Sequence, residues 1–410
     1  MSDSCTVVVV GGGAAGLMAA LWAARQEGVQ VKLLEGSKKC GAKIVAAGGG
    51  RCNVLPAEVD ASDFHTQGSP NVLKRLLKTW RLEDVKNFFD WDLQLPLAEA
   101  EADGRIFPEC QSGSKVRNNL VEAVENAGAE VLTGWRVESL DKDEYGFLLT
   151  ASDGRKLHAK RVVLASGGSS VPATGSDGHG FRLATALGHK LNHPYPALVP
   201  LTTNDDDFHQ LSGVAVEVRW RAILNHKTVE ERSRDLLFTH RGFSGPAILD
   251  ASHWAVRDKA AILVAWGDGS EDEWSAHLNA KERRELGKAL SDVLPRRLAL
   301  ALLEKTDLRP EMRCSNLSKG QRLRLIKNLT AFQLPINGNE GFKVAEVTGG
   351  GVRLEGVNPS TLESRATPGL FLCGEILDLT GRMGGFNFHW AWLSGRLAGT
   401  CAANMRPDRS

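Results

Sequence analysis

The sequence predicts an α/β fold in which a Rossmann-like domain is interrupted by an inserted β-rich and helical domain. Glycine is in excess, at 43 of 410 residues, and many of the glycines follow short apolar runs. The first segment alternates strand, glycine turn, helix and strand, over residues 6–10, 11–16, 17–26 and 30–34. Composition changes near residue 190, and glycine-rich loops return after residue 341. The pattern predicts a discontinuous domain made of 1–190 and 340–410, with 191–339 inserted.

The glycine turn after the first strand has the spacing of a dinucleotide-binding loop. Gly11 permits the tight turn, Gly13 lets a pyrophosphate approach the backbone, and Gly16 lets the helix pack closely on the strand. The helix N-terminus then faces the phosphates with its free N–H groups. Glu35 follows Gly16 by 19 residues, at a strand end where a carboxylate accepts hydrogen bonds from ribose hydroxyls. A carboxylate there disfavours a 2′-phosphate on the same ribose.

Length and composition argue against several other classes of protein. The chain has 50 Lys and Arg against 49 Asp and Glu, which argues against nucleic-acid binding over the whole surface and against an anionic-membrane anchor. No apolar run approaches the roughly 20 residues of a membrane helix, and the first residues do not resemble a secretory signal. The seven cysteines include no Cys-x-x-Cys pair, which argues against a zinc site. We expect a cytoplasmic protein with a small-molecule substrate, and the sequence defines no oligomeric state.

Periodicity and turn residues predict the remaining elements. Helices are expected over 72–90, 114–127, 181–187, 271–303, 319–329 and 386–403. Strands are expected over 130–141, 145–151, 156–164, 214–224 and 369–373. Two of these strands lead into glycine-rich loops, at 164–168 and 372–375.

These two strand ends favour FAD over NAD as the dinucleotide. Glycine-rich strand ends such as those at Gly167 and Gly374 return to more distant parts of a cofactor, whereas a simple NAD dehydrogenase needs only one. Asp378 is suited to accept a hydrogen bond from a ribityl hydroxyl. The last helix begins near Gly385 and Phe386, and backbone N–H groups there are suited to stabilise negative charge on a reduced flavin ring.

Seven segments, in order along almost the whole chain, carry a family resemblance. They are 10–16, Lys43 with 48–53, 104–108, 174–178, 242–246, 374–378 and 384–392. The first is shared by most flavin enzymes, whereas the second and the last two are specific. On these motifs the chain resembles the HI0933-like flavoproteins, a family of NAD(P)/FAD-dependent oxidoreductases. The resemblance implies one FAD per chain, bound by the discontinuous domain, with the insertion covering the flavin face.

The resemblance also implies which residues contact FAD. Carried over position by position, they are Ala15, Glu35, Lys43, Gly49, Asn53, Val137, Gly374, Asp378, Gly385, Phe386 and Asn387. The glycine turns add Gly11, Gly13, Gly16 and Gly167 to this predicted cofactor site. No catalytic acid or base is assigned, and no metal ligand is expected.

Three residues near these motifs leave alternatives open. Arg382 and His389 depart from the family pattern, and a cation facing the flavin would favour an anionic reduced ring. The alternative is a solvated Arg382 and a packed His389. Cys52 has no second cysteine four residues away, so we expect a small buried thiol rather than a redox dithiol.

Two functions from different classes are compatible with the sequence. The first is an FAD-dependent oxidoreductase that passes a hydride through flavin N5, from a small organic substrate or NAD(P)H to O2 or an unsaturated compound. NAD(P)H would bind only transiently, because no second glycine motif of this kind is present. The alternative is a flavin-binding RNA-associated or regulatory protein related to tRNA-modifying flavoproteins. The basic clusters at 281–284 and 295–297 predict a solvated helix face, because acids alternate with them.

Overall fold

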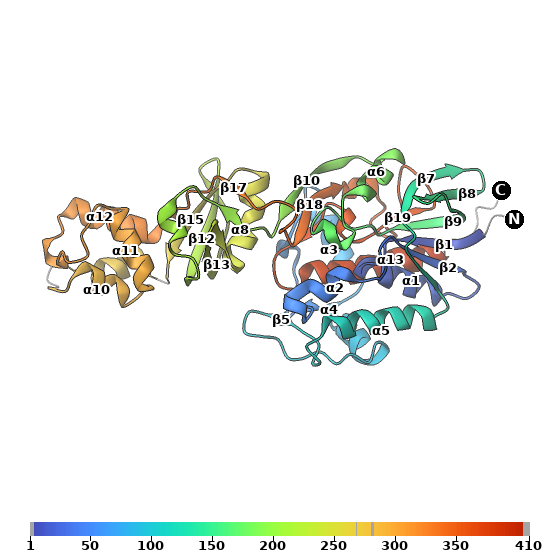
Figure 1. The fold of residues 1–410 in the computed structure, drawn as a ribbon, viewed down its shortest axis with the longest axis horizontal. Coiled ribbons are helices and arrows are strands. Elements are labelled where there is room, and N and C mark those ends of the chain that lie inside the picture. Colours follow the sequence, from blue (N-terminus) through green and yellow to red (C-terminus); the bar gives the residue numbers. More distant parts are fainter. Residues whose placement is uncertain (1–3, 268, 280–282, 405–410) are drawn as a thin grey trace. The chain divides into compact units, whose positions relative to one another are not determined.

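The computed structural model describes residues 4–267, 269–279 and 283–404. The chain divides into two compact units (Figure 1). Unit 1 holds the residues up to Tyr195 and those from Val347 onward, and unit 2 is Pro196–Glu346. Among the described residues, no helix combines the length and the apolar character needed to cross a bilayer.

A mixed sheet forms the centre of unit 1. Its strand order is β6-β2-β1-β9-β8-β7, and β19 also pairs with β9. The strands are β1 (Ser4–Val10), β2 (Val31–Glu35), β6 (Glu130–Thr133), β7 (Val137–Asp143), β8 (Gly146–Ala151), β9 (Lys156–Leu164) and β19 (Leu370–Leu372). The pairs β1–β2, β1–β9, β2–β6 and β9–β19 are parallel, and β7–β8–β9 are antiparallel. The predicted Rossmann-like α/β class is confirmed.

Helices and short strand pairs complete unit 1. The helices are α1 (Ala14–Ala24), α2 (Ala42–Ala46), α3 (Pro70–Leu77), α4 (Leu82–Asn87), α5 (Gly113–Asn126), α6 (His179–Ala186) and α13 (Phe386–Asn404). The pairs are β3 (Leu55–Pro56) with β5 (Arg105–Ile106), β4 (Phe64–His65) with β20 (Thr380–Gly381), and β10 (Leu191–Ala197) with β18 (Val347–Val352). The β4–β20 pair brings residues from the N-terminal and C-terminal parts of the chain together.

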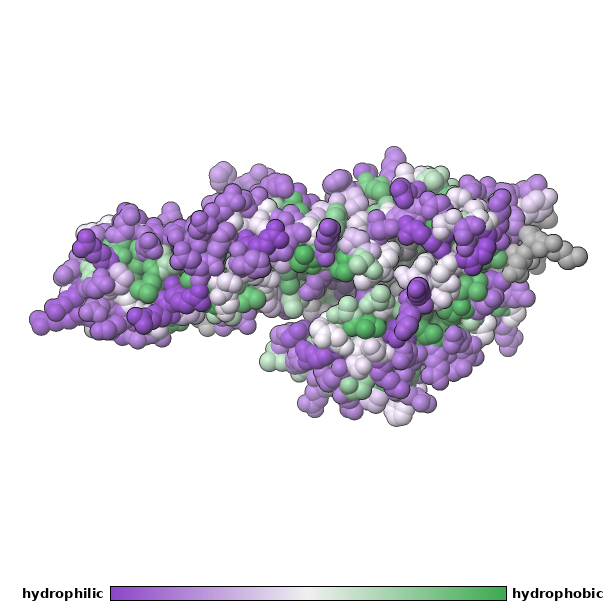
Figure 2. All heavy atoms as spheres, in the orientation of Figure 1, coloured by the Kyte–Doolittle hydropathy of each residue, from purple (hydrophilic) through white to green (hydrophobic). Residues whose placement is uncertain are grey.

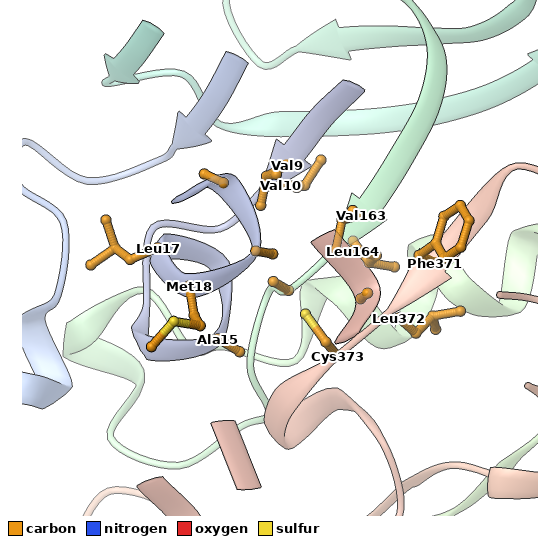
Figure 3. Close-up of a cluster of buried hydrophobic side chains, with 14 of the residues drawn as sticks. Val9, Val10, Ala15, Leu17, Met18, Val163, Leu164, Phe371, Leu372 and Cys373 are labelled. Atoms are coloured by element: carbon orange, nitrogen blue, oxygen red, sulfur yellow. The ribbon is translucent and has the colours of Figure 1, made fainter. Parts of the chain in front are cut away.

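The core of unit 1 lies where β1, α1, β9 and β19 meet. Val9, Leu17, Val163 and Leu372 have no exposed surface, and Figure 3 shows side chains from all four elements gathering there. Burial of each such side chain contributes about 1.5–3 kcal/mol to stability. Because this core forms directly beneath the carboxyl ends of the strands, it fixes the loops that leave them.

Unit 2 is an antiparallel sheet with helices. The strand order is β16-β15-β12-β13-β14-β11-β17. The strands are β11 (Leu201–Thr202), β12 (Ala215–Leu224), β13 (Lys227–Thr239), β14 (Gly242–Ser244), β15 (Ala261–Trp266), β16 (Phe332–Gln333) and β17 (Gly338–Asn339). The helices are α7 (Asp206–His209), α8 (Pro246–Arg257), α9 (Glu271–His277), α10 (Leu286–Ser291), α11 (Arg296–Glu304) and α12 (Lys319–Thr330). The predicted β-rich and helical character of the insertion is confirmed.

Two predicted helices and one predicted strand are interrupted. The helix expected over 72–90 breaks between α3 and α4, where Trp80 turns inward and packs edge-on against Trp22, with ring centroids 5.9 Å apart. The helix expected over 271–303 is divided into α9, α10 and α11. The break before α11 arises because Pro295 cannot occupy a helix interior. The strand expected over 130–141 breaks at Gly134, which has a φ of +64°.

Candidate cofactor site

The turn between β1 and α1 needs glycine at two positions for the fold itself. Gly11 has a φ of +105°, and a Cβ there would lie 2.5 Å from the carbonyl oxygen of Ala165. A Cβ on Gly16 would lie 1.8 Å from the carbonyl oxygen of Gly11. Real Cβ atoms do not approach backbone so closely, so these glycines set the contact of α1 with the strand ends.

Gly13 has a different environment from the other two glycines of the motif. Its φ is −78°, which any residue adopts, and no heavy atom lies within 4 Å of the position of a Cβ. Gly13 is the N-cap of α1, and no side chain caps this helix. The first-turn amides therefore have no acceptor within the helix, and the space beside the Gly13 backbone is open. Open space beside free amides at a helix N-terminus suits the pyrophosphate of a dinucleotide.

Glu35 lies beside this turn, at the end of β2. Its Oε2 accepts a hydrogen bond from the Gly12 amide at 2.7 Å, and its Oε1 accepts one from the Ser37 amide at 2.7 Å. The backbone thus fixes a half-buried carboxylate where the ribose of a dinucleotide would lie. The Trp135 amide donates to the carbonyl oxygen of Glu35. Val137 follows two residues later and is buried in the core.

Lys43, on α2, is part of a buried polar network. Its Nζ donates to Ser170 Oγ at 2.7 Å and to Glu375 Oε2 at 2.9 Å. Glu375 Oε1 also accepts from Ser170 Oγ at 2.8 Å and from the Thr348 amide at 3.0 Å. Burial alone would raise the pKa of Glu375, but the Lys43 ammonium and these hydrogen bonds outweigh it and hold the pKa below its usual value. If Lys43 contacts FAD, its ammonium group would have to bind FAD in addition to Ser170 and Glu375.

The glycine loops of Gly49, Gly167 and Gly374 have positive φ angles of +67°, +73° and +77°. A Cβ on Gly49 would meet no atom within 4 Å, whereas one on Gly374 would lie 2.7 Å from the Cβ of buried Ala15. The Gly374 amide donates to Ser394 Oγ at 3.0 Å, so this amide is already occupied. Gly374 thus allows its loop to pack closely against Ala15, whereas the space beside Gly49 is open.

Asn53 is brought to the start of α13. In the amide orientation that satisfies both of its groups, Asn53 accepts from the Gly385 amide at 3.0 Å and donates to the Leu55 carbonyl at 3.2 Å. Asn387 reaches back to Gly381, donating to its carbonyl at 2.8 Å and accepting from its amide at 2.9 Å. These contacts order the loop before α13 and leave the first-turn amides of the helix without an acceptor inside it.

Asp378 and Phe386 are almost fully buried. Asp378 Oδ2 accepts from the Gln67 amide at 2.9 Å and from Asn192 Nδ2 at 2.7 Å. The ring of Phe386 packs beneath the Arg382 guanidinium, which lies 4.2 Å from the ring centroid. Phe386 is therefore a packing residue by its side chain, and only its backbone is suited to meet a cofactor.

The structure defines the protein surroundings of Arg382 and His389, the two residues that depart from the family pattern. Arg382 Nε donates to Asp63 Oδ1 at 2.7 Å, so its charge is paired. His389 has no exposed surface, and neither ring nitrogen has a hydrogen-bond partner among the described residues. Burial lowers the pKa of His389 to about 4. The packed alternative thus describes His389, and the ring is enclosed by protein.

Replacing His389 with Leu is expected to stabilise the fold, most strongly in acid. A buried polar group without a partner costs about 1–3 kcal/mol. Because the pKa falls from 6.5 in the unfolded chain to about 4 in the fold, the wild type loses stability as the pH falls through this window, by up to about 3 kcal/mol. Urea unfolding of both proteins at pH 8 and pH 5 measures the effect. Equal stability losses in the two proteins would contradict the buried, neutral imidazole.

Cys52 lies in the same glycine loop, and burial raises the pKa of its thiol to about 12. It is therefore a buried thiol and not a thiolate, as expected.

All the predicted cofactor residues lie in unit 1, and their contacts with FAD stay a prediction. Sequence reasoning missed Ser170, Thr348 and Asn192, which complete the two polar networks. The signal available was that Ser170 and Glu375 follow strand ends of the same parallel sheet.

Comparison with known proteins places the chain in a family. The model of the HI0933-like protein Rossmann domain matches residues 5–401. A 3-dehydro-bile acid delta(4,6)-reductase of Clostridium scindens is 34% identical over 96% of this chain and 98% of its own length. A ribosomal RNA dihydrouridine synthase of Escherichia coli is 32% identical over 98% of each chain. A solved 3-ketosteroid delta1-dehydrogenase of Sterolibacterium denitrificans shares the fold, with a TM-score of 0.53 and 14% identity over 98% of this chain and 100% of its own.

These matches cover both units, because the relatives and the family model extend across almost the entire length. They confirm the predicted resemblance and the predicted class of flavoprotein oxidoreductase. The chain belongs to the HI0933-like family.

Proposed function

We propose that the chain is an FAD-dependent reductase that saturates a carbon–carbon double bond conjugated with a carbonyl group. The observation that carries the proposal is the pair of full-length relatives. One is named as a delta(4,6)-reductase of a 3-dehydro-bile acid and the other as a dihydrouridine synthase. The substrates named differ greatly in size, but both reactions add hydrogen across a double bond in conjugation with a carbonyl.

The residues of unit 1 fit FAD. Space at Gly13 and the free amides of α1 suit the pyrophosphate, and the fixed Glu35 carboxylate suits the adenosine ribose. When bound, FAD supplies a hydride from N5 to the β-carbon of the double bond. The first-turn amides of α13 are suited to stabilise negative charge on the ring after it accepts electrons. The α-carbon takes up a proton, and no side chain is assigned to deliver it.

The remaining roles are part of the same proposal. NAD(P)H would supply the electrons in a transient encounter, since Glu35 and the glycine turn account for one dinucleotide only. Unit 1 holds the cofactor, and unit 2 contributes to recognition of the substrate. A cytoplasmic location agrees with the six cysteines whose side chains the structure describes, which are all free thiols.

Anaerobic stopped-flow absorbance near 450 nm tests the proposal with the FAD-loaded protein. NADH or NADPH is expected to bleach the flavin, and cyclohexenone is expected to restore the colour while forming cyclohexanone. Cyclohexanone itself, which lacks the double bond, is the matched control and is expected to have no effect. Cyclohexenone and uridine are the two conjugated acceptors tested. If O2 restores the flavin colour but neither of these compounds does, the result would contradict reduction of a conjugated double bond.

The RNA-associated alternative is favoured by one specific observation. Two ribosomal RNA dihydrouridine synthases, of Escherichia coli and Haemophilus influenzae, are 32% and 30% identical to this chain over nearly its whole length. In this version the acceptor is the uracil base of an RNA, so the two candidates differ in the substrate and not in the flavin chemistry. Salt-dependent binding of RNA by the holoprotein distinguishes them.

A further inference from the structure

We propose that unit 2 carries an RNA-binding surface on α12 and on the segment before this helix. The proposal rests on the proposed reduction of a conjugated double bond and names RNA as the molecule that presents it. We define the basic surface as five exposed cations, which are Arg309, Arg313, Lys319, Arg324 and Lys327. None of them belongs to the predicted cofactor site.

The basic surface is a local excess of charge that the balanced composition of the whole chain conceals. No Asp or Glu occurs between Glu311 and Glu340, whereas five Arg and Lys do, and four of these five belong to the basic surface. The fifth member of the surface, Arg309, precedes Glu311. Since the whole chain has a net charge of only +1, the remainder is net negative. The charge balance that argues against nucleic-acid binding over the whole surface therefore does not apply to this part of unit 2.

The cations of the basic surface lack carboxylate partners. Elsewhere in unit 2, Lys305 pairs with Asp205 at 2.7 Å and Arg257 pairs with Asp258 at 2.6 Å. Within the described residues, no carboxylate oxygen lies within 4.0 Å of a cationic nitrogen of the basic surface. The Arg324 guanidinium donates to the Thr306 carbonyl at 2.9 Å, which orients the group without neutralising its charge. Unpaired like charges repel one another, and a polyanion removes this repulsion.

The fold gives α12 no apolar face for a membrane. Leu325, Ile326 and Leu329 are buried in the core of unit 2, and Leu323 is the large apolar side chain that the described part of this helix exposes, at 58%. Figure 2 shows mostly hydrophilic residues over the region of α10–α12. A membrane-surface helix needs a continuous apolar face opposite its cations. Exposed cations with so few apolar side chains among them suit binding to a phosphate backbone. Uracil contains a double bond conjugated with a carbonyl, and it is the base that distinguishes RNA from DNA.

The basic cluster expected at 281–284 adjoins the segment that carries Arg313, because the Cys314 amide donates to the Arg284 carbonyl at 3.0 Å. Lys281 lies outside the described residues, and Arg284 forms an ion pair with Asp292. Arg297 donates to backbone carbonyls of Gln210 and Ser212. Arg284 precedes α10 and is paired, so it does not form the solvated helix face that the sequence predicts. The RNA surface is assigned to α12 and the segment before it.

Fluorescence anisotropy of the FAD-loaded protein with a labelled 20-nucleotide polyuridine tests the proposal. The double variant Arg324→Glu with Lys327→Glu is expected to bind roughly tenfold or more weakly. The slope of log K against log salt is expected to become shallower by about 1.4, because each lost phosphate contact on a single strand accounts for about 0.7. The control Lys227→Glu with Lys343→Glu makes the same change of charge at exposed positions of unit 2 and is expected to bind within about twofold of the wild type.

Absence of RNA binding by the wild type, or equal loss in both double variants, would overturn the proposal. Binding of phosphatidylglycerol vesicles instead of RNA would overturn it as well. Circular dichroism melting of each variant shows that the fold is retained. Cyclohexenone reduction is measured on the same proteins and is expected to be unchanged in the α12 variant. If the wild type fails to reduce cyclohexenone but binds RNA through α12, the reductase proposal fails while the RNA surface stands.

Discussion

Replacing Gly13 with Asp is expected to abolish FAD binding while the apoprotein stays folded and becomes slightly more stable. Gly13 is the N-cap of α1 with an ordinary φ of −78°, and a Cβ there meets no atom within 4 Å. Asp is a favourable N-cap, and its advantage over Gly at this position is roughly a few tenths of a kcal/mol. Its carboxylate would occupy the place of the pyrophosphate, and two like charges about 4 Å apart cost about 4 kcal/mol at an intermediate dielectric constant. The affinity for FAD is therefore expected to fall by roughly 1,000-fold.

Quenching of FAD fluorescence on titration with apoprotein measures this effect, alongside thermal melting of the apoproteins. Gly13→Asn is the matched control, because it has nearly the same shape and also caps the helix but carries no charge. The Asn variant is expected to bind FAD more tightly than the Asp variant. Wild-type affinity in the Asp variant would show that the pyrophosphate does not bind at this turn.

Replacing Gly16 with Ala is expected to damage the fold itself, with or without cofactor. A Cβ on Gly16 would lie 1.8 Å from the Gly11 carbonyl oxygen, and this oxygen belongs to backbone that cannot turn away as a side chain would. Forcing an additional carbon into a packed site typically costs about 1–3 kcal/mol of stability. Because the added Cβ of Gly16→Ala would overlap backbone atoms, we expect a cost at or above the upper end of this range. We expect a loss of about 3 kcal/mol in the free energy of unfolding, measured by urea denaturation of the apoprotein.

Gly320→Ala provides the control for this variant. Gly320 lies in α12, and a Cβ there would meet no atom within 4 Å. Ala in a helix is more favourable than Gly by about 0.5–1 kcal/mol, so this variant is expected to be more stable than the wild type. A Gly16→Ala protein as stable as the Gly320→Ala protein would contradict the tight contact between α1 and the first turn.

The sequence predicts the geometry of the β1–α1 turn well because its determinants are local. A strand, three glycines at fixed spacing, a helix and a terminal acid are all readable within 35 residues, and the structure places Gly11, Gly16 and Glu35 as this pattern requires. The pattern cannot tell which glycine serves the fold and which leaves room for a ligand. The distinction between Gly16 and Gly13 depends on atoms of the neighbouring backbone, and only the structure supplies them.

Long-range polar networks were the part that the sequence could not predict. Lys43, Ser170 and Glu375 are separated from one another by more than a hundred residues in sequence and meet through the sheet topology. Likewise, residue type alone does not distinguish a backbone contact from a side-chain contact. The ring of Phe386 is buried under Arg382, so the prediction that it contacts FAD applies to its backbone.

Helix breaks were the least predictable feature of the fold. The periodicity over 72–90 is helical throughout, and the break between α3 and α4 arises because Trp80 is more favourably buried against Trp22 and Phe88 than left on a continuous helix. Tertiary packing thus overrides local propensity. The break before α11 was readable in hindsight from Pro295 alone.

The flavin content of the purified protein tests the central claim most directly. The protein is purified without denaturation, incubated with excess FAD, desalted and acidified, and the released flavin is identified by chromatography and quantified against the protein. The account predicts a yellow protein that releases one FAD per chain. A colourless protein that retains no FAD after this incubation, or one that retains FMN instead, would contradict the assignment of the β1–α1 turn to a dinucleotide.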